Sequence, residues 1–509
     1  MRLPVFWLIL LLAPPLLAVL VLPPFGQRMV VLVGLYALLG LGYQLVFGQL
    51  GALNLAQGAM FGIGAYATAL TAPALGPLAL PAAALAAALP AALVGAPLLR
   101  LQSHYFALAT LAFASLVNLL AVHAEDLTGG ANGLAGFAAP VPRGPVLLAT
   151  VWLCLIAAVL LYARIFGGRA GATARLLREA PLAAATLGID GAGWRLAAFV
   201  AGSALAGLAG GFSATLSGVV SPEATGFPIM VLCLTSVVLG GSRHPMGAVV
   251  GAALAVCLPE LMRGLQGAWL LAYAVATLAV VLWAPEGLAG LVDRLRGAVA
   301  LPSPAPVLPR VLPSAAGPHR LLLDGVTKRF GGVEALSAVS LSVGRGEVVG
   351  VIGSNGSGKT TLLNVVSGLE RADAGTIALD GRRIERLAAH QVARAGIART
   401  FQSLPLAGDT RATDLARAVG TGAAFLLLDE PAAGAGENER RELEAVLARL
   451  RASGRGVLIV DHDVELLSRA CDRLVCLDRG RVIASGTPAE VRADPAVRAS
   501  FLGLDGRAA

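Results

Sequence analysis

Long apolar runs fill the first three fifths of the chain and then stop. A helix needs about 20 apolar residues to cross a bilayer, and ten segments have roughly that length and composition. They lie at about residues 4–22, 29–48, 53–72, 76–99, 105–124, 145–165, 194–218, 227–241, 246–262 and 268–284. The third is rich in Gly and Ala and the eighth is short, so both are candidates for broken or re-entrant helices, which are common where a substrate path is built. The pattern predicts a polytopic helical membrane domain.

The first of these segments has two interpretations. Arg2 precedes an apolar run, as in a signal peptide. The run is long, contains Pro14 and Pro15, lacks a clear A-x-A cleavage site and is followed by further spans. We favour an uncleaved first helix, with a cleaved leader as the alternative.

Basic residues give the orientation of the spans. One long loop between the sixth and seventh segments holds four of them, Arg164, Arg169, Arg175 and Arg178. The positive-inside rule places this loop in the cytoplasm. The Gly-rich loop DLTGGANG, residues 126–133, then faces outward, and ten spans leave both ends inside. Three arginines fall on the outer side and disagree with this topology: Arg28, Arg143 and Arg263.

A few polar side chains interrupt the apolar segments: Gln44, Gln49, Asn54, Gln57 and Asn118. Polar groups inside a membrane are costly unless paired and often mark a transport pathway. Hydrogen bonding between helices is the alternative, and we favour it slightly.

Composition divides the chain. Overall, 56% of residues are hydrophobic and only 14% are charged, against about 25% charged in an ordinary soluble domain. Residues 1–300 hold 13 Arg, no Lys and 8 acidic residues, whereas the remaining 209 residues hold 26 basic and 23 acidic ones. Between the two parts, residues 301–318 contain six prolines, which predicts an extended, semi-rigid linker. We therefore predict a membrane domain at 1–300, a linker at 301–318 and a soluble domain at 319–509.

A phosphate-binding loop lies early in the soluble part. GSNGSGKTT follows the apolar run VVGVI at 348–352 and fits the pattern G-x-x-x-x-G-K-[ST]. Its glycines let backbone N–H groups wrap phosphates, and the N-terminus of the following helix adds positive charge. Lys359 is predicted to pair with the β- and γ-phosphates and Thr360 to hold Mg²⁺. The predicted ATP-binding residues of the loop are Gly353, Ser354, Asn355, Gly356, Ser357, Gly358, Lys359, Thr360 and Thr361.

Two further strands end in groups suited to ATP chemistry. FLLLDE, residues 425–430, is an apolar strand followed by two carboxylates. We predict that Asp429 binds the metal and that Glu430 polarises the attacking water as a general base. GVLIVDHD places His462 after another apolar strand, where it can sense a γ-phosphate. An exposed acidic pair and a surface histidine are the alternatives that these motifs leave when taken singly.

These motifs, in this order, resemble the ATP-binding cassette (ABC) family over nearly all of residues 320–504. The resemblance implies that Phe330 in TKRFGG stacks on adenine. It also implies that Gln402 in ARTFQ is catalytic, binds the metal and links it to the membrane domain. Asp429, Glu430 and His462 match the family's second nucleotide motif and switch histidine. ARTFQ, LLLDEPAAG and CDRLVCLDRGRVIASGTPAEV look most like the ATPases of branched-chain amino acid importers.

The membrane half resembles the permeases of the same importers over about residues 28–292. FGQLGALNLAQGAMFGIGAY, DLTGGANGL and ALAGLAGGFSATLSGVVSPE fit that pattern, so two subunits that are usually separate are predicted to be fused. The segment 175–188, RLLREAPLAAATLG, is too polar to span and predicts a short helix at the inner surface. Either it is an ordinary amphipathic loop helix, or it transmits motion between the two halves.

One departure from the family concerns the ATPase. An intact cassette has a helical subdomain, ending in a signature that resembles LSGGQ, between the glutamine loop and the second nucleotide motif. Here Gln402 and Asp429 are 27 positions apart and no such signature occurs. In the family, each signature completes the ATP site of the partner cassette, and the helical subdomain helps to seat the cassette on the membrane domain. A block is therefore predicted to be missing at about 404–412, which leaves docking of the cassette open.

We therefore expect about ten spans followed by a truncated α/β P-loop cassette, in a bacterial cytoplasmic membrane with the cassette inside. The expected function is ATP- and Mg²⁺-dependent import of branched-chain or other hydrophobic amino acids. The resemblance implies a second permease, a second ATPase with an intact signature and an extracytoplasmic binding protein. A non-hydrolytic pseudo-ATPase subunit, a defective gene product, and urea or short amides as substrates are the alternatives.

Overall fold

The structure is a computed structural model of the 509-residue chain. It describes residues 4–99, 101, 103–137, 142–261, 269–284, 286–296, 320–401, 415 and 418–501. The predicted linker, Gln402 and the predicted deletion site at 404–412 lie outside these residues. The chain divides into two compact units, Met1–Arg178 with Ala192–Leu301, and Glu179–Gly191 with Pro302–Ala509.

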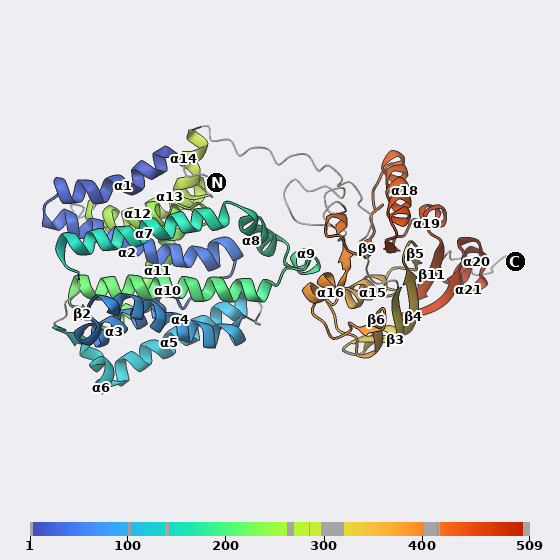
Figure 1. Cartoon of the computed structure of the whole chain (residues 1–509), viewed down its shortest axis with the longest axis horizontal. Helices are drawn as coiled ribbons and strands as arrows, with labels where there is room; N and C mark the ends of the chain where they lie inside the picture. Colours follow the sequence, from blue (N-terminus) through green and yellow to red (C-terminus); the bar gives the residue numbers. More distant parts are fainter. Residues whose placement is uncertain are drawn as a thin grey trace. The chain divides into compact units, whose positions relative to one another are not determined.

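Each of the ten predicted apolar segments is a helix in the first unit. The helices are α1 Val5–Leu20, α2 Pro24–Tyr43, α3 Gln57–Leu75, α4 Ala79–Leu98, α5 Ser103–His123, α7 Gly144–Phe166, α10 Gly191–Ser217, α11 Phe227–Gly240, α12 Gly247–Leu261 and α13 Trp269–Trp283. Five stretches of the described chain are long and apolar enough to cross a membrane, and one of them joins α3 and α4 into Gln57–Leu98. The long helices run roughly alongside one another (Figure 1).

The shorter elements of this unit lie at the ends of the long helices. They are the π-helix Gln44–Gly48, α6 Glu125–Thr128, α8 Arg169–Glu179, α14 Gly287–Leu295, and the two-residue strands β1 Leu134–Ala135 and β2 Val219–Val220, which pair. The predicted break in the third segment lies before α3 rather than in it: the π-helix and a non-helical stretch at 51–56 precede a continuous helix. A proline at 181 divides the predicted helix at 175–188 between α8 and α9, Pro181–Thr186.

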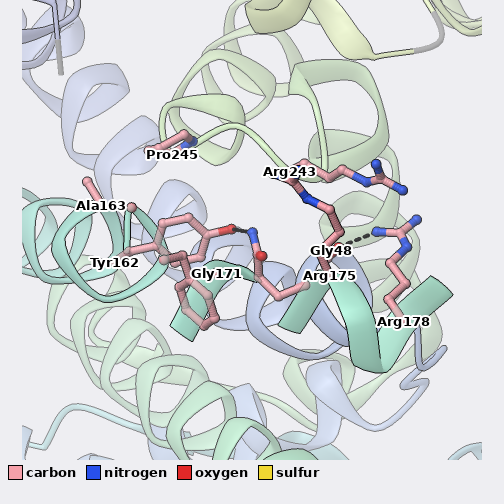
Figure 2. A pocket seen from close by; sticks show the side chains of 11 residues that line it. Gly48, Tyr162, Ala163, Gly171, Arg175, Arg178, Arg243 and Pro245 are labelled. Atoms are coloured by element: carbon pink, nitrogen blue, oxygen red, sulfur yellow. Dashed lines mark hydrogen bonds between the residues drawn. The ribbon is translucent and has the colours of Figure 1, made fainter. Parts of the chain in front are cut away.

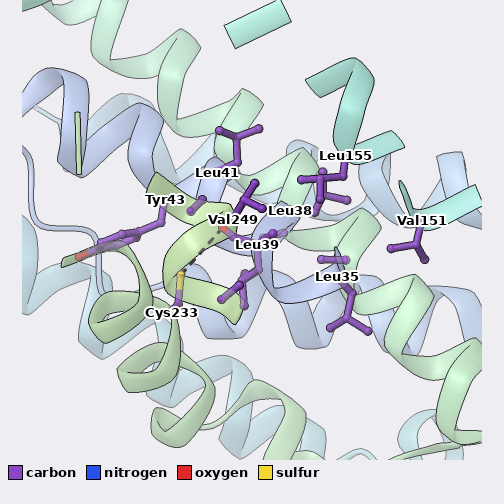
Figure 3. Packing of buried hydrophobic residues seen from close by; sticks show 14 of the residues in the cluster. Leu35, Leu38, Leu39, Leu41, Tyr43, Val151, Leu155, Cys233 and Val249 are labelled. Carbon is purple, nitrogen blue, oxygen red and sulfur yellow. Dashed lines mark hydrogen bonds between the residues drawn. The ribbon is translucent and has the colours of Figure 1, made fainter. Parts of the chain in front are cut away.

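Helix α2 is the centre of the first unit. In its most apolar window 72% of residues are buried, against 22% for α5. Leu35 and Leu39 of α2 belong to one buried cluster with Val151 of α7, Cys233 of α11 and Val249 of α12 (Figure 3). By contrast, an apolar stripe of α4 is exposed, at Leu85, Leu89 and Leu93. Such a stripe suits contact with lipid tails, because contiguous exposed apolar side chains are uncommon on surfaces that face water.

Glycines set how closely the membrane helices approach. A Cβ on Gly64 of α3 would lie 2.1 Å from the carbonyl oxygen of Gly207 in α10, and one on Gly210 would lie 1.9 Å from the carbonyl oxygen of Phe61. Both obstacles are backbone atoms, which no side-chain rotation removes. Small residues at such crossings allow backbone-to-backbone van der Waals contact, which holds helices together in lipid.

The second unit contains two sheets. A six-stranded sheet has the order β12-β11-β5-β10-β9-β8, and a four-stranded antiparallel sheet has the order β4-β3-β6-β7. The first is parallel except for β12. Its strands are β5 Val348–Ile352, β8 Ile397–Arg399, β9 Phe425–Asp429, β10 Gly456–Val460, β11 Arg473–Asp478 and β12 Arg481–Gly486; the others are β3 Arg320–Phe330, β4 Val333–Gly344, β6 Ala374–Leu379 and β7 Arg382–Arg383.

Helices cover both faces of the parallel sheet. They are α15 Lys359–Val366, α16 Ala389–Ala395, α18 Glu437–Ala452, α19 Val464–Ala470, α20 Pro488–Ala493 and α21 Pro495–Phe501. Strands β5, β9 and β10 are buried at every residue, as expected for parallel strands covered on both sides. Alternate residues enter different cores: Val349 and Val351 of β5 join one, and Val348 and Ile352 the other.

We predict that Gly64→Ala lowers the thermal unfolding midpoint of the full chain in detergent. The added methyl would meet the backbone of α10 and force the two helices apart, at a cost of about 1–3 kcal/mol. The matched control is Gly168→Ala, since a Cβ there meets nothing within 4 Å. Equal midpoints for the two variants would contradict the close crossing of α3 and α10.

Candidate functional site

The phosphate-binding loop joins β5 to α15, as the sequence predicts. Gly353, Gly356 and Gly358 have φ angles of +156°, +80° and +103°, which L side chains rarely adopt. A Cβ on Gly353 would lie 2.2 Å from the carbonyl oxygen of Leu477. The loop therefore requires glycine at these positions to curve tightly in front of α15. Within it, the buried Ser357 Oγ has no hydrogen-bond partner among the described residues.

Lys359 folds back over this loop. Its Nζ donates hydrogen bonds to the carbonyl oxygens of Gly353 at 2.8 Å and Ser354 at 2.9 Å, and the residue is 8% exposed. Burial holds the pKa of Lys359 below its usual range, while the nearby carboxylates of Glu430 and Asp429 act in the opposite direction. The lysine therefore lies close to the carboxylates of Glu430 and Asp429. Its ammonium group is hydrogen-bonded to two loop carbonyl oxygens, which phosphate oxygens can replace as acceptors.

Asp429 ends β9 and is ion-paired. Its Oδ2 lies 2.9 Å from Nη2 of Arg399, which is the last residue of the neighbouring strand β8. Both side chains are buried, at 2% exposed for the arginine and 8% for the aspartate. Arg399 also donates to Asn364 Oδ1 at 2.7 Å and to Ser367 Oγ at 3.2 Å. One guanidinium therefore connects β8, β9 and the end of α15.

The catalytic candidates follow β9 and β10. Glu430 has a φ of +43°, in the left-handed region, so the chain turns sharply after Asp429. His462 Nδ1 lies 3.8 Å from Glu430 Oε2 and 3.4 Å from Asp461 Oδ1. Asp461 is fully buried, and its Oδ2 accepts a hydrogen bond from the Ala432 N–H at 3.0 Å. It therefore joins the turn after β10 to the turn after β9, which brings the predicted base and the predicted switch histidine together.

The remaining predicted residues surround the loop. Thr360, at the start of α15, and Asn355 are exposed, whereas Ser354 and Thr361 are half-buried. Phe330 is 46% exposed at the end of β3, and Lys328 Nζ lies 5.2 Å from its ring centroid. Strand β4, which pairs with β3, also lies against the phosphate-binding loop. A Cβ on Gly358 of the loop would lie only 2.5 Å from the carbonyl oxygen of Ala335 in β4. Gln402 lies outside the described residues.

Arg399 and Asp461 were not predicted as site residues. Arg399 lies in ARTFQ and Asp461 in GVLIVDHD. The position of Asp461, directly after a fully apolar strand, could have indicated a functional residue. Nothing in the sequence pairs Arg399 with Asp429, because that contact depends on β8 lying beside β9.

Helix α9 packs within the second unit. It contacts α16 and β8, and its Ala183, Ala184 and Thr186 are buried. Arg394 of α16 donates through Nε to the Gly188 carbonyl oxygen at 3.1 Å. The segment after the arginine-rich loop thus packs against the helix and strand that precede Gln402 in the second unit.

The polar residues of the membrane helices make hydrogen bonds. Gln44 Nε2 donates to the Gly241 carbonyl at 2.8 Å, Gln57 Nε2 to the Gly202 carbonyl at 3.1 Å, and Asn54 Nδ2 to Gln57 Oε1 at 3.1 Å. These contacts favour a role in joining helices and adjacent turns. Asn118 in addition lines a cavity of about 300 Å³ between α3, α5 and α11. Its Nδ2 donates to the Pro222 carbonyl at 2.9 Å and to Thr225 Oγ1 at 2.8 Å.

Comparison with known families gives three matches. Residues 27–284 match the family described as the branched-chain amino acid transport system / permease component. Residues 336–477 match the ABC transporter family, and residues 481–505 match the branched-chain amino acid ATP-binding cassette transporter family.

Individual relatives match the second unit. The high-affinity branched-chain amino acid transport ATP-binding protein BraF of Pseudomonas aeruginosa is 30% identical over 248 residues, which cover 36% of this chain and 97% of BraF. LivG of Escherichia coli, which has the same description, is 29% identical with the same coverage. The lipopolysaccharide export system ATP-binding protein LptB of Escherichia coli is 31% identical, covering 37% of this chain and 98% of LptB.

A crystal structure of the ADP conformation of an ATP-binding cassette of an ABC transporter is also similar to this chain. The two sequences are 25% identical, the match covers 36% of this chain and 99% of the other chain, and the TM-score is 0.35.

The permease family covers 258 of the 509 residues, and the alignment with BraF covers 97% of that ATPase. The protein belongs to the branched-chain amino acid ABC transporter family, with a membrane-embedded permease domain and an ABC ATPase domain in one polypeptide.

Proposed function

We propose that this chain is a fused permease and ATPase subunit of an importer for branched-chain or other hydrophobic amino acids, in a bacterial cytoplasmic membrane. The observation that carries the proposal is the convergence of Lys359, Asp429, Glu430 and His462 at one end of a parallel sheet, in a unit on which α9 is docked. The domain arrangement proposed is a permease at 1–300, a linker at 301–318 and a cassette at 319–509.

The residues present fit a magnesium–ATP complex. The glycine-rich loop in front of α15 offers backbone N–H donors to phosphates. The Ser357 Oγ, which has no hydrogen-bond partner among the described residues, and the exposed Thr360 hydroxyl offer oxygen ligands. Phe330 would stack on adenine. Asp429, Thr360 and Gln402 would hold Mg²⁺, which supplies charge neutralisation of the β- and γ-phosphates when bound. Lys359 would exchange its loop carbonyls for phosphate oxygens.

Glu430 would act as the general base, with His462 beside it. The left-handed backbone at Glu430 and the buried Asp461 fix where these two groups lie. A base held in place needs no reorganisation during the reaction, which is a large part of catalysis in phosphoryl transfer.

Coupling would run through β8. Helix α9 contacts this strand, and the strand ends in Arg399, which is ion-paired with Asp429. A shift of α9 during transport would therefore move β8, and through Arg399 it would displace the proposed metal ligand Asp429. This gives the coupling interpretation of the segment 175–188 a physical route.

The proposed loss of the helical subdomain has support in chain length. The 248-residue alignment with BraF uses only 36% of this 509-residue chain, about 183 residues, so about 65 aligned positions have no counterpart here. Only residues 400–424 separate β8 from β9. A parallel crossover needs about a dozen residues, so the sheet can close without the subdomain.

A cassette without a signature can offer its own phosphate loop to a partner but cannot complete the partner's site. The assembly proposed therefore contains a second ATPase with an intact signature, a second permease and an extracytoplasmic binding protein, and its direction of transport is inward. A pair of these chains alone would hydrolyse ATP poorly. The missing signature equally favours a non-hydrolytic subunit, and the next experiment separates the two.

We predict that the full chain in lipid nanodiscs hydrolyses ATP when paired with a partner ATPase that carries its own Glu→Gln change. Lys359→Ala and Glu430→Gln in this chain should each lower that rate at least about a hundredfold, because one removes a phosphate contact and the other the general base. The measurement is phosphate release. ATP binding without release in every pairing would instead identify a pseudo-ATPase or an inactive gene product.

We also predict that Arg399→Met destabilises the cassette by about 3–5 kcal/mol, because it leaves the Asp429 carboxylate buried without its cation. Thermal unfolding of the full chain in detergent, followed with and without Mg²⁺–ATP, measures this. The matched control is Arg386→Met, an exposed arginine on the same unit, with an expected change within about 0.5 kcal/mol. Similar losses for the two variants would refute the role given to Arg399.

A further inference from the structure

The first unit has a cavity lined by arginines and another lined mainly by apolar groups. The former, of about 110 Å³, lies where the π-helix, α7, α8 and the turn between α11 and α12 meet (Figure 2). Arg243 lines it together with Gln49 and Arg175. The latter is the cavity of about 300 Å³ that Asn118 lines. Sites for small molecules have volumes of about 300–1,000 Å³, so the larger cavity has room for a small ligand.

This larger cavity lies where two membrane helices begin. Helix α3 starts at Gln57, after the non-helical stretch at 51–56, and α11 starts at Phe227, after the 3₁₀ turn Pro222–Thr225. Non-helical backbone within a membrane is tolerated where it packs on protein or lines a polar cavity. Interrupted helices of this kind form the substrate sites of many transporters.

The two helix starts lie at the same depth, partway across the membrane domain. A Cβ on Gly58 of α3 would lie 3.0 Å from the carbonyl oxygen of Gly226, directly before α11. At the start of α3, Gln57 donates to the carbonyl oxygen of Gly202. Gly202 lies near the middle of α10, which is long enough to cross a membrane. The cavity is therefore within the span rather than at its surface.

Helix α5 forms the third wall and is hydrogen-bonded to both interruptions. Thr110 Oγ1 accepts a hydrogen bond from the backbone N–H of Leu55 at 3.0 Å. One and a half turns beyond it in space, on the same helix, Asn118 donates to the Pro222 carbonyl and to Thr225 Oγ1. These bonds hold α5 beside both helix starts, so the cavity is bounded by residues from three separate segments.

The lining combines apolar walls with one free acceptor. Leu111 and Val122 of α5 and Met230 of α11 are among the apolar lining residues. Both N–H groups of the Asn118 amide are already donated, while its Oδ1 accepts no hydrogen bond from the described residues. What Asn118 can offer to a ligand is therefore a hydrogen-bond acceptor.

These features favour a small molecule that is apolar at one end and a hydrogen-bond donor at the other. An acyl chain of a lipid would fill the apolar walls but would leave the amide oxygen without a donor, which is costly away from water. An ammonium group supplies that donor, and a hydrogen bond to a charged group is stronger than one between neutral groups.

We propose that this cavity binds the transported amino acid, with its apolar side chain against α5 and α11 and its ammonium group on Asn118 Oδ1. The substrate class rests on the proposed function. The substrate carboxylate would face the first turns of α3 and α11, neither of which has a side-chain cap. Asn118 then orients the substrate, and the apolar walls select its side chain.

The test labels the full chain in lipid nanodiscs with a leucine analogue that carries a diazirine in its side chain. After irradiation, mass spectrometry locates the labelled residues. Label should appear on the lining residues Leu111, Val122 or Met230, and excess leucine should remove it. Asparagine should need at least about a tenfold higher concentration for the same protection, because its polar side chain gains nothing from apolar walls.

Filling the cavity should remove the labelling. Ala114 is a half-buried lining residue of α5, and Ala114→Phe should reduce labelling of the other lining residues at least about tenfold. The matched control is Ala112→Phe, which adds the same ring to an exposed position on the same helix, outside the described cavity lining. It should be labelled as the wild type is.

A second variant tests the contact with the ammonium group. The competitor is 4-methylpentanoate, which is leucine without its amino group. In the wild-type chain leucine should protect at about a tenfold lower concentration than this competitor. In Asn118→Leu the two should protect equally. A merely destabilised variant would lose protection by both compounds alike and would keep their ratio, so the ratio distinguishes lost recognition from lost folding.

Several results would overturn the proposal. They are labelling that misses the lining residues, equal protection by leucine and asparagine, equal effects of Ala114→Phe and Ala112→Phe, and an unchanged ratio in Asn118→Leu. Protection by decanoate as effective as that by leucine would make the cavity a site for an acyl chain instead. The labelling needs no ATP, so its failure beside normal phosphate release would refute this site alone and leave the proposed function standing.

Discussion

The parallel arrangement of β5, β9 and β10 is the constraint on which the nucleotide chemistry depends. Parallel strands present their carboxyl ends at one edge, so residues about 30 to 100 positions apart in sequence meet there: Lys359, Asp429 and His462. Every residue of these three strands is buried. The apolar cores on both faces therefore hold the edge in place, and the charged residues do not have to stabilise it themselves.

The short connection between β8 and β9 shows what this architecture tolerates. Those strands pair in register even though only residues 400–424 join them. The Arg399–Asp429 pair joins the two ends of this connection, and α9 contacts β8 just before it. The residues that face this chain's own nucleotide site therefore do not depend on a long segment between β8 and β9.

Much of this could be predicted from the sequence. All ten apolar segments are helices, because a long apolar run has few alternatives in a membrane, and the phosphate loop lies between the strand and helix that its glycines indicate. The sequence did not reveal the Arg399–Asp429 pair, because it depends on which strands are neighbours. Nor did it reveal that Pro181 separates α8 from α9, or that Arg243 shares a cavity with Gln49 and Arg175. Such features arise from tertiary packing rather than from local pattern.

The most direct test of the account is the number of ATP molecules occluded per assembled pair of cassettes. Glu430→Gln in this chain and the matching change in its partner ATPase would trap bound nucleotide, and radiolabelled ATP retained after rapid filtration would count it. We predict one ATP per assembly, held between the phosphate loop of this chain and the signature of the partner. Two occluded ATP molecules per assembly would contradict the account, because this chain would then be completing its partner's site as well.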